Sequence, residues 1–190
     1  MNANVGMVYP VAATVQTYTP GSSISYKSPG SNFAEAVSAS LSWERADGHF
    51  YGDDVELDSD NGVLGYTIDF EPTGLSDSAR ALLLGETVSS SEYTITDAAA
   101  PDVGFGYIRV MRDKGTVSYE AWWYYKLKFG ISSEETRTKE RSIEWRVPTL
   151  QGVGSGISLD STGTLSFCQH QTFTSLASAK AYLNGKAGIT

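Results

Sequence analysis

Residues 48–85 carry the pattern that most constrains the fold of this chain. Hydrophobic and polar residues alternate over residues 55–57 and again over 66–71, which is the period of a strand with one buried face. Asn61-Gly62 stands between these segments, and both residues adopt the positive φ angles of a tight turn at low cost. We therefore predict a β-hairpin that turns at Asn61-Gly62.

A short helix is predicted directly after this hairpin, over residues 75–85. Ser76 is a good N-cap residue, Asp77 suits the first turn, and Gly85 suits the C-terminal stop. The two strands and the capped helix are expected to pack as one unit.

Alternation elsewhere predicts a mainly β chain. A second short helix is expected over residues 174–184, with Leu176, Ala179 and Leu183 on one apolar face and Gly185 as its stop. Many short strands with two short helices favour a β-sandwich or half-barrel with one helix packed on it. The further predicted strands cover residues 13–18, 24–26, 33–44, 92–96, 105–112, 117–129, 141–150 and 164–168.

The chain is expected to divide into three segments. Residues 1–32 are rich in Gly, Ser, Thr and Pro and form an N-terminal arm, which is either a loosely ordered terminus or a segment that orders against a neighbouring subunit. Residues 33–151 form a β-rich core with the helix near 76–84. Residues 152–190 start with a flexible, Gly-rich joint at 152–156 and end with a strand and a helix.

The charge of the chain bears on its partners. A net charge of −8 and a pI near 4.7 argue against a conventional nucleic-acid binder, because such proteins hold phosphates with basic side chains. A surface past which DNA slides would instead repel phosphates. The single cysteine, Cys168, rules out an internal disulfide and is interpreted as a small apolar filler. No apolar run reaches membrane-spanning length, and Met1–Gly6 lacks signal-peptide features, so the chain is expected to fold in the cytoplasm.

No catalytic, metal or cofactor site is expected, and the chain is not expected to be an enzyme. His49 and His170 are far apart, and neither a Gly-x-Ser-x-Gly elbow nor a phosphate-binding Gly-rich loop is present. Residues 58–62 resemble a calcium loop, but the glycine comes one place early and the closing glutamate is missing. A weak cation site in this turn is the minor alternative.

Four consecutive aromatic residues, 122–125, are the surface feature that stands out. Strand alternation cannot bury all four in one core, so Trp122 and Tyr124 are expected to meet something other than the main core. That something is a partner subunit, a second layer of the same chain, or a sugar.

An ordered pattern of residues resembles the major tail protein (tail tube protein) family of phages with long, non-contractile tails. The resemblance covers residues 30–150 and involves no chemically diagnostic motif. It is carried by Trp43-Glu44-Arg45, residues 48–54, the acidic Asn-Gly turn, Gly65-Tyr66, Ile68-Asp69-Phe70, Ala81–Gly85 and Arg141–Leu150.

The resemblance implies a structural protein of the siphovirus virion, assembled in the host cytoplasm. In this family, hexameric rings stack head to tail around a channel for DNA ejection, and the inner sheets of neighbouring subunits join edge to edge. Implied partners are further copies of the chain, the tape measure, terminator and distal tail proteins, and DNA in passage, with no membrane. Residues 1–32, 87–103 and 130–140 would order on assembly.

The resemblance also suggests roles for particular residues. Probable core residues are Trp43, Phe50, Tyr51, Tyr66, Phe70 and Trp145. Channel-lining candidates are Glu35, Ser38, Ser40, Ser42 and Glu44, with Asp69 and Glu71 as a competing set, and a plain solvated sheet face is the alternative for them. Subunit-interface candidates are Trp122, Tyr124, Glu134, Glu135 and Arg137.

Other functions stay open at this point. A β-sandwich carbohydrate-binding module would use Trp122 and Tyr124. A capsid decoration or tail-terminator protein is the alternative among β-rich virion proteins.

Overall fold

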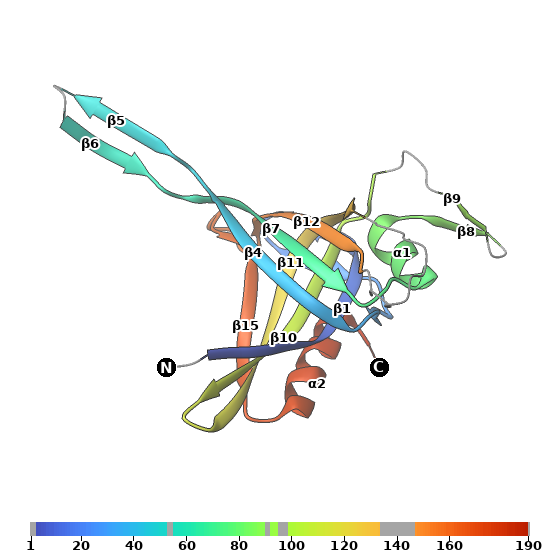
Figure 1. The fold of residues 1–190 in the computed structure, drawn as a ribbon. Coiled ribbons are helices and arrows are strands. Elements are labelled where there is room, and N and C mark those ends of the chain that lie inside the picture. Colours follow the sequence, from blue (N-terminus) through green and yellow to red (C-terminus); the bar gives the residue numbers. More distant parts are fainter. Residues whose placement is uncertain (1–2, 53–54, 90–91, 95–98, 134–146, 190) are drawn as a thin grey trace, which may run out of the picture.

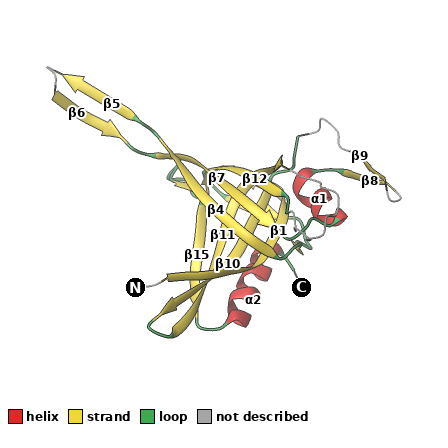
Figure 2. Cartoon of the chain, in the orientation of Figure 1, coloured by secondary structure: helices red, strands yellow, loops and turns green. Residues whose placement is uncertain are grey.

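The computed structural model describes residues 3–52, 55–89, 92–94, 99–133 and 147–189, which form a mainly β fold with two helices (Figures 1 and 2). The prediction of a mainly β chain is confirmed, whereas the specific tail-tube arrangement stays a prediction. The elements are β1 (Ala3–Thr19), β2 (Ser23–Tyr26), β3 (Ser31–Asn32), β4 (Ala36–Arg45), β5 (Gly48–Gly52), β6 (Val55–Asp60), β7 (Val63–Pro72), α1 (Asp77–Leu84), β8 (Thr87–Ser89), β9 (Glu92–Thr94), β10 (Val103–Asp113), β11 (Thr116–Ser133), β12 (Thr149–Ser155), β13 (Ile157–Ser158), β14 (Leu165–Ser166), β15 (Cys168–Phe173) and α2 (Leu176–Ala187).

One large antiparallel sheet organises the described residues. Its strand order is β2-β1-β10-β11-β12-β7-β4, with β15 also paired to β11 and β3 to β1. The 18-residue strand β11 connects two parts of this sheet. Its first part pairs with β10 and β15, and its last part pairs with β12.

Both faces of the sheet around β11 are buried, each by a different cluster. Trp123 lies on the face that α2 covers with Ala179 and Leu183. Tyr124 lies on the other face, packed with Phe105 and Tyr66 in the larger cluster. The aromatic run is therefore buried from both sides within one chain.

The prediction of a hairpin that turns at Asn61-Gly62 is wrong. Strand β7 pairs with β4, and β6 pairs with β5, so residues 36–72 form one long hairpin whose tip lies outside the described residues. Gly62 has no positive φ, and its N–H donates instead to the Oδ1 of Asp60 at 2.8 Å. This local hydrogen bond, with Ala46 N–H donating to Gly62 O at 2.7 Å, marks a break between the two parts of the hairpin.

Helix α1 forms as its sequence predicts. Ala79 N–H donates to Ser76 Oγ at 3.3 Å, and Gly85 closes the helix with a φ of 72°. The buried residues Ala79 and Leu83 attach α1 to the larger core cluster. Helix α2, in contrast, continues through Gly185 and ends at Gly188, whose φ is 66°, so the predicted stop at Gly185 is wrong.

The N-terminal segment is part of the sheet, not an arm with little to bury. Strand β1 pairs with β10 along most of its length, and Val11, Ala12 and Ala13 are completely buried. The expectation of a loose or partner-dependent terminus is wrong for these residues, because small side chains at this position let β1 lie between the two core clusters.

The Gly-rich joint predicted at 152–156 is also wrong, since most of it belongs to the inner strand β12. Gly152 and Gly154 face the large core cluster. A Cβ at Gly154 would overlap the ring of Tyr66, and one at Gly152 would lie 2.7 Å from Phe129 Cε1. These glycines therefore make room for large side chains on the neighbouring strands.

Candidate functional site

A polar sheet face is the main candidate site, and it begins on β4 and β7. Ser38 is paired with Glu71 and Ser40 with Asp69, so the two sets of channel-lining candidates share one face. Ser38 Oγ donates to Glu71 Oε2 at 2.8 Å across the strands. The prediction from the sequence gave these two sets as alternatives, because sequence spacing does not show that their strands are neighbours.

This face continues across β12. Gln151 is paired with Asp69, and its Nε2 donates to Asp69 Oδ1 at 3.0 Å. Gln151, Val153 and Ser155 are exposed, while the glycines between them are buried. Residues 151–155 alternate as a strand does, but the inward-facing positions are glycines, so the sequence shows no hydrophobic alternation there.

A bulge in β11 places two lysines at the far side of the face. Gly104 of β10 stands opposite both Tyr125 and Lys126, because the register shifts between Val103 and Phe105. The extra residue reverses the alternation. Tyr124 and Leu127 therefore both face the large core cluster, while Lys126 and Lys128 face away from it.

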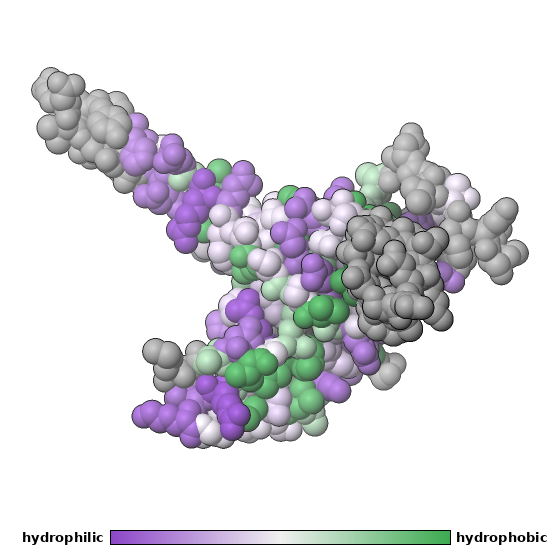
Figure 3. All heavy atoms as spheres, viewed as in Figure 1, coloured by the Kyte–Doolittle hydropathy of each residue, from purple (hydrophilic) through white to green (hydrophobic). Residues whose placement is uncertain are grey.

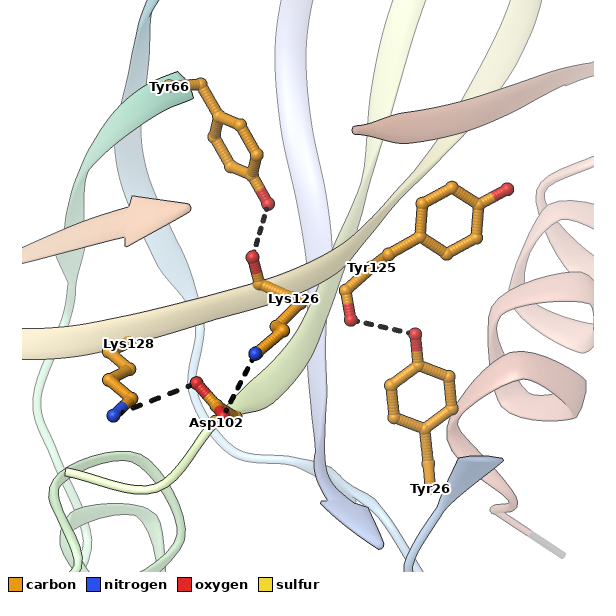
Figure 4. A network of polar contacts seen from close by, with 6 residues as sticks. All are labelled: Tyr26, Tyr66, Asp102, Tyr125, Lys126 and Lys128. Atoms are coloured by element: carbon orange, nitrogen blue, oxygen red, sulfur yellow. Dashed lines mark hydrogen bonds and ion pairs between the residues drawn. The ribbon is translucent and has the colours of Figure 1, made fainter. Parts of the chain in front are cut away.

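Two tyrosines, the buried Tyr66 and the half-buried Tyr26, contact this bulge from opposite sides (Figure 4). Tyr66 Oη donates to the main-chain oxygen of Lys126 at 3.0 Å, and Tyr26 Oη donates to that of Tyr125 at 2.8 Å. Both hydroxyls are protonated donors at neutral pH, and burial, which raises the pKa of each, keeps them so into the alkaline range. The bulge is thus a stable feature of the core.

Asp102 lies between the two lysines. Its carboxylate oxygens are 3.4 Å from Lys126 Nζ and 4.0 Å from Lys128 Nζ (Figure 4). Two ammonium groups share one carboxylate, which leaves a positive charge in excess at this side of the face. Glu44 at the β4 side has no ion-pair partner among the described residues.

We refer to these residues together as the polar face. A shallow hollow of about 390 Å³ crosses one end of it, between Glu44, Leu64, Val153, Asp102 and the two lysines. The polar face consists of Ser38, Ser40, Ser42 and Glu44 on β4, Thr67, Asp69 and Glu71 on β7, Gln151, Val153 and Ser155 on β12, and Lys126 and Lys128 on β11.

Glu35 is the channel-lining candidate that the structure places apart from these strands. It precedes β4 and is exposed, and its main-chain oxygen accepts from Thr73 N–H at 2.9 Å. Its main chain therefore lies beside the end of the β4–β7 pair.

The polar face is bordered by two sheet edges. Strand β4 is the last strand of the sheet. At the other border, β10 pairs with β11 only as far as Leu127, whereas β15 and β12 both lie along the opposite edge of β11. Among the described residues, positions 128–133 of β11 therefore pair with β12 alone. The four strands β4, β7, β12 and β11 thus end in two open edges.

The predicted interface aromatics lie inside the chain. Tyr124 is completely buried, so the expectation of an exposed side chain is wrong, and the second-layer alternative holds for it. Trp122 is half-buried, with Arg109 Cζ 4.4 Å from its ring and His170 stacked at 4.4 Å. Positions Glu134, Glu135 and Arg137 lie outside the described residues.

The core assignments are confirmed in part. Tyr66 and Phe70 are buried, but Trp43 is 39% exposed on the edge strand β4, so its assignment to the core is wrong. The side chains of Phe50 and Tyr51, and all of Trp145, lie outside the described residues.

Three properties of the described residues concern metal binding, thiol chemistry and membrane spanning. They contain no group of three His, Cys, Asp or Glu side chains that could hold a metal ion. Burial raises the pKa of the half-buried Cys168 thiol, which makes it a weaker nucleophile. None of the helices in the described part of the chain is long and apolar enough to span a membrane.

Comparisons of the chain with protein-family models, with curated proteins and with solved structures found no match.

Proposed function

We propose that this chain is the structural subunit of a phage tail tube, in which copies form rings that stack around a channel for DNA. One observation carries the proposal. Within the described residues, the polar face is not covered by another layer, and it ends in two strand edges that have no partner strand. A sheet of this kind is completed by further copies of itself.

The residues of the polar face suit a channel wall. Short hydroxyl side chains on β4 give a smooth surface, and Asp69 and Glu71 on β7 carry negative charge. Carboxylates repel the phosphates of a passing DNA, which keeps it from binding. The net charge of −8 acts in the same direction at longer range.

The open edges suit assembly. Unpaired N–H and C=O groups at a sheet edge can pair with another chain, and a closed barrel removes every edge. Stacking of rings is a heterologous contact that does not close, and it therefore produces a tube. The resemblance in sequence supplies the remaining details of the proposal, namely hexameric rings, the other tail proteins as partners, and a place in the virion.

The β5–β6 ribbon is the part of the chain best placed to reach a neighbouring ring. It projects from the rest of the fold, and its base is hydrophilic in the space-filling view (Figures 1 and 3). A lone two-stranded ribbon is marginally stable in water. Contact with a further copy would stabilise it. Because β1 lies in the sheet, it is a poorer candidate for this role than the sequence suggested.

Negative-stain electron microscopy of the concentrated protein tests this function. We expect rings, or tubes with a central channel, and their number should rise with protein concentration. A protein that stays monomeric at every concentration and salt level would contradict the proposal. Rings that never stack would favour a tail terminator or a capsid decoration protein.

No observation favours a carbohydrate-binding module. Tyr124 offers no surface, and Arg109 and His170 already contact the ring of Trp122. A sugar platform needs an open aromatic face.

A further inference from the structure

Between its two register shifts, at Ala36/Ser38 and Glu44/Arg45, strand β4 is an edge strand with little of the usual protection. Exposed edges are normally shortened, or carry Pro, Lys or an inward charge. Strand β4 is ten residues long, and its first eight residues, 36–43, contain neither a charge nor a proline. Val37 and Trp43 on this strand are 54% and 39% exposed. These features indicate that another strand covers β4.

The second open edge, residues 128–133 of β11, runs in the direction that antiparallel pairing with β4 requires. Each of β11, β12, β7 and β4 runs antiparallel to its neighbour. Strands β4 and β11 therefore run in opposite directions. If every copy has the same orientation about a ring axis, β4 of the next copy lies antiparallel to β11. The pattern of the sheet then continues across the joint without a change.

The side chains of the two edges match face for face. Lys128 and Gly130 are on the polar side of β11, as Ser40 and Ser42 are on β4. On the opposite side, Ile131 meets the same large core cluster as Leu41. A slip of one residue would place hydrophobic side chains on the polar face. Only staggers of zero or an even number of residues keep the faces matched.

The charges of the two edges are complementary. Lys126 and Lys128 share one carboxylate, and Glu44 has no ion-pair partner among the described residues. In one row of the sheet, Glu44 is paired with Gly65 and Gly65 with Ser155. In the next row on the same face, Ser42 is paired with Thr67, Thr67 with Val153, and Val153 with Lys128. A stagger of zero or two residues therefore brings Glu44 of one copy to a lysine of the next. Pairing β4 with a second β4 would leave both charges unmatched.

From these observations we infer that β4 of one copy pairs antiparallel with residues 128–133 of β11 of the next copy, with Glu44 facing Lys126 or Lys128 across the joint. This inference rests on the proposed function, since it names the surfaces by which copies join into a ring. It also gives a partner to Glu44, the acidic residue of the polar face that lies on the border strand β4.

Disulfide trapping tests the joint. In a Cys168→Ala background, Gly130→Cys is combined in turn with Ser38→Cys, Ser40→Cys or Ser42→Cys. The serines differ from cysteine in one atom, and nothing lies within 4 Å of a Cβ at Gly130. Oxidation of the assembled protein should give a ladder of covalent oligomers in one of the three double variants, and the productive partner reports the stagger. Reductant should collapse the ladder to monomer.

Single variants and a matched pair provide the controls. Each single cysteine variant should remain monomeric on denaturing gels, because a heterologous joint never brings the same residue of two copies together. Gly130→Cys with Ser178→Cys, which adds an exposed position on α2, should also give no ladder.

The outcomes separate this inference from the function. Covalent dimers from Ser40→Cys alone would show an isologous β4–β4 joint and overturn the inference. Tubes in the microscope without a ladder in any double variant would overturn the inference and leave the tail-tube function standing. Absence of any assembly in the reduced parent protein would overturn both.

Discussion

The hydroxyl of Tyr66 donates a hydrogen bond of 3.0 Å to the main-chain oxygen of Lys126, 60 residues away in the sequence. This contact joins β7 to the bulge in β11. Because the bulge turns Lys126 and Lys128 toward the polar face, the hydroxyl of a buried tyrosine contacts the segment that carries the lysines two strands away.

Tyr66→Phe is expected to destabilise the fold. The substitution leaves a buried carbonyl oxygen without its donor, which costs about 1–3 kcal/mol. Urea unfolding measures the change in the free energy of unfolding. Tyr119→Phe is the matched control, because Tyr119 is half-buried and its hydroxyl has no hydrogen-bond partner in the described structure. Equal losses in both variants would show that the Lys126 contact has no special role.

Gly154→Ala should lower the thermal midpoint. A Cβ at this position overlaps the Tyr66 ring, and overpacking of this kind costs about 1–3 kcal/mol. Gly130→Ala lies in the neighbouring strand with open space around its Cβ, so it should be close to neutral. Calorimetry of the two variants side by side checks the difference. If Gly154→Ala melts no lower than Gly130→Ala, the glycine does not serve to accommodate Tyr66.

Stability should fall at alkaline pH. Burial raises the pKa of Tyr26, Tyr66 and Tyr124 above the ordinary tyrosine value of 10.0. The folded chain therefore holds these protons more tightly than the unfolded chain. The resulting stability is fully present below about pH 10 and is lost above it, by up to about 1.4 kcal/mol per pH unit for each tyrosine.

Urea midpoints measured between about pH 8 and pH 11 test this sign. The midpoint should stay level up to about pH 9.5 and then fall steeply. Tyr66→Phe should show a shallower fall, because it has one buried hydroxyl fewer. A midpoint that rises above pH 10 would contradict the assignment.

Charge reversal at the proposed joint should be reciprocal. Lys128→Glu and Glu44→Lys should each raise the protein concentration at which assembly begins, by about two- to five-fold, and the double variant should restore it. Light scattering against concentration measures this onset. Lys180→Glu on α2 is the control for net charge. Additive losses in the double variant would count against a Glu44–Lys128 contact.

Additional lysines in the middle of β4 should make the polar face retain DNA. In assembled tubes, Ser40→Lys with Ser42→Lys places cations around the whole channel, and counterion release then favours phosphate binding. Sedimentation of tubes formed with a short DNA duplex should carry more duplex in this variant than in the parent protein. Ser178→Lys with Ala181→Lys adds the same charge on exposed positions of α2. Equal retention by the two variants would place the polar face outside the channel.

Features that depend on short-range chemistry could be predicted from the residues alone. Ser76 and Gly85 bound α1 because capping uses atoms within four residues. The mainly β character followed from two-residue alternation, and the burial of Tyr66 and Phe70 agreed with the resemblance. Ser38, Ser40 and Ser42 could be assigned to one face for the same reason, since successive side chains of a strand point to opposite sides.

Which strands are neighbours became clear from the folded chain alone. The Asn61-Gly62 signal was local and misplaced the turn, because the pairing of β4 with β7 depends on residues that are distant in sequence. The glycines in β12 predicted a flexible joint, but in the folded chain Tyr66 and Phe129 fill the space next to them. The bulge at Tyr125-Lys126 is set by Gly104 and two remote tyrosine hydroxyls. Strand pairing and bulges depend on side-chain packing between residues that are distant in the sequence, and sequence spacing does not contain that information.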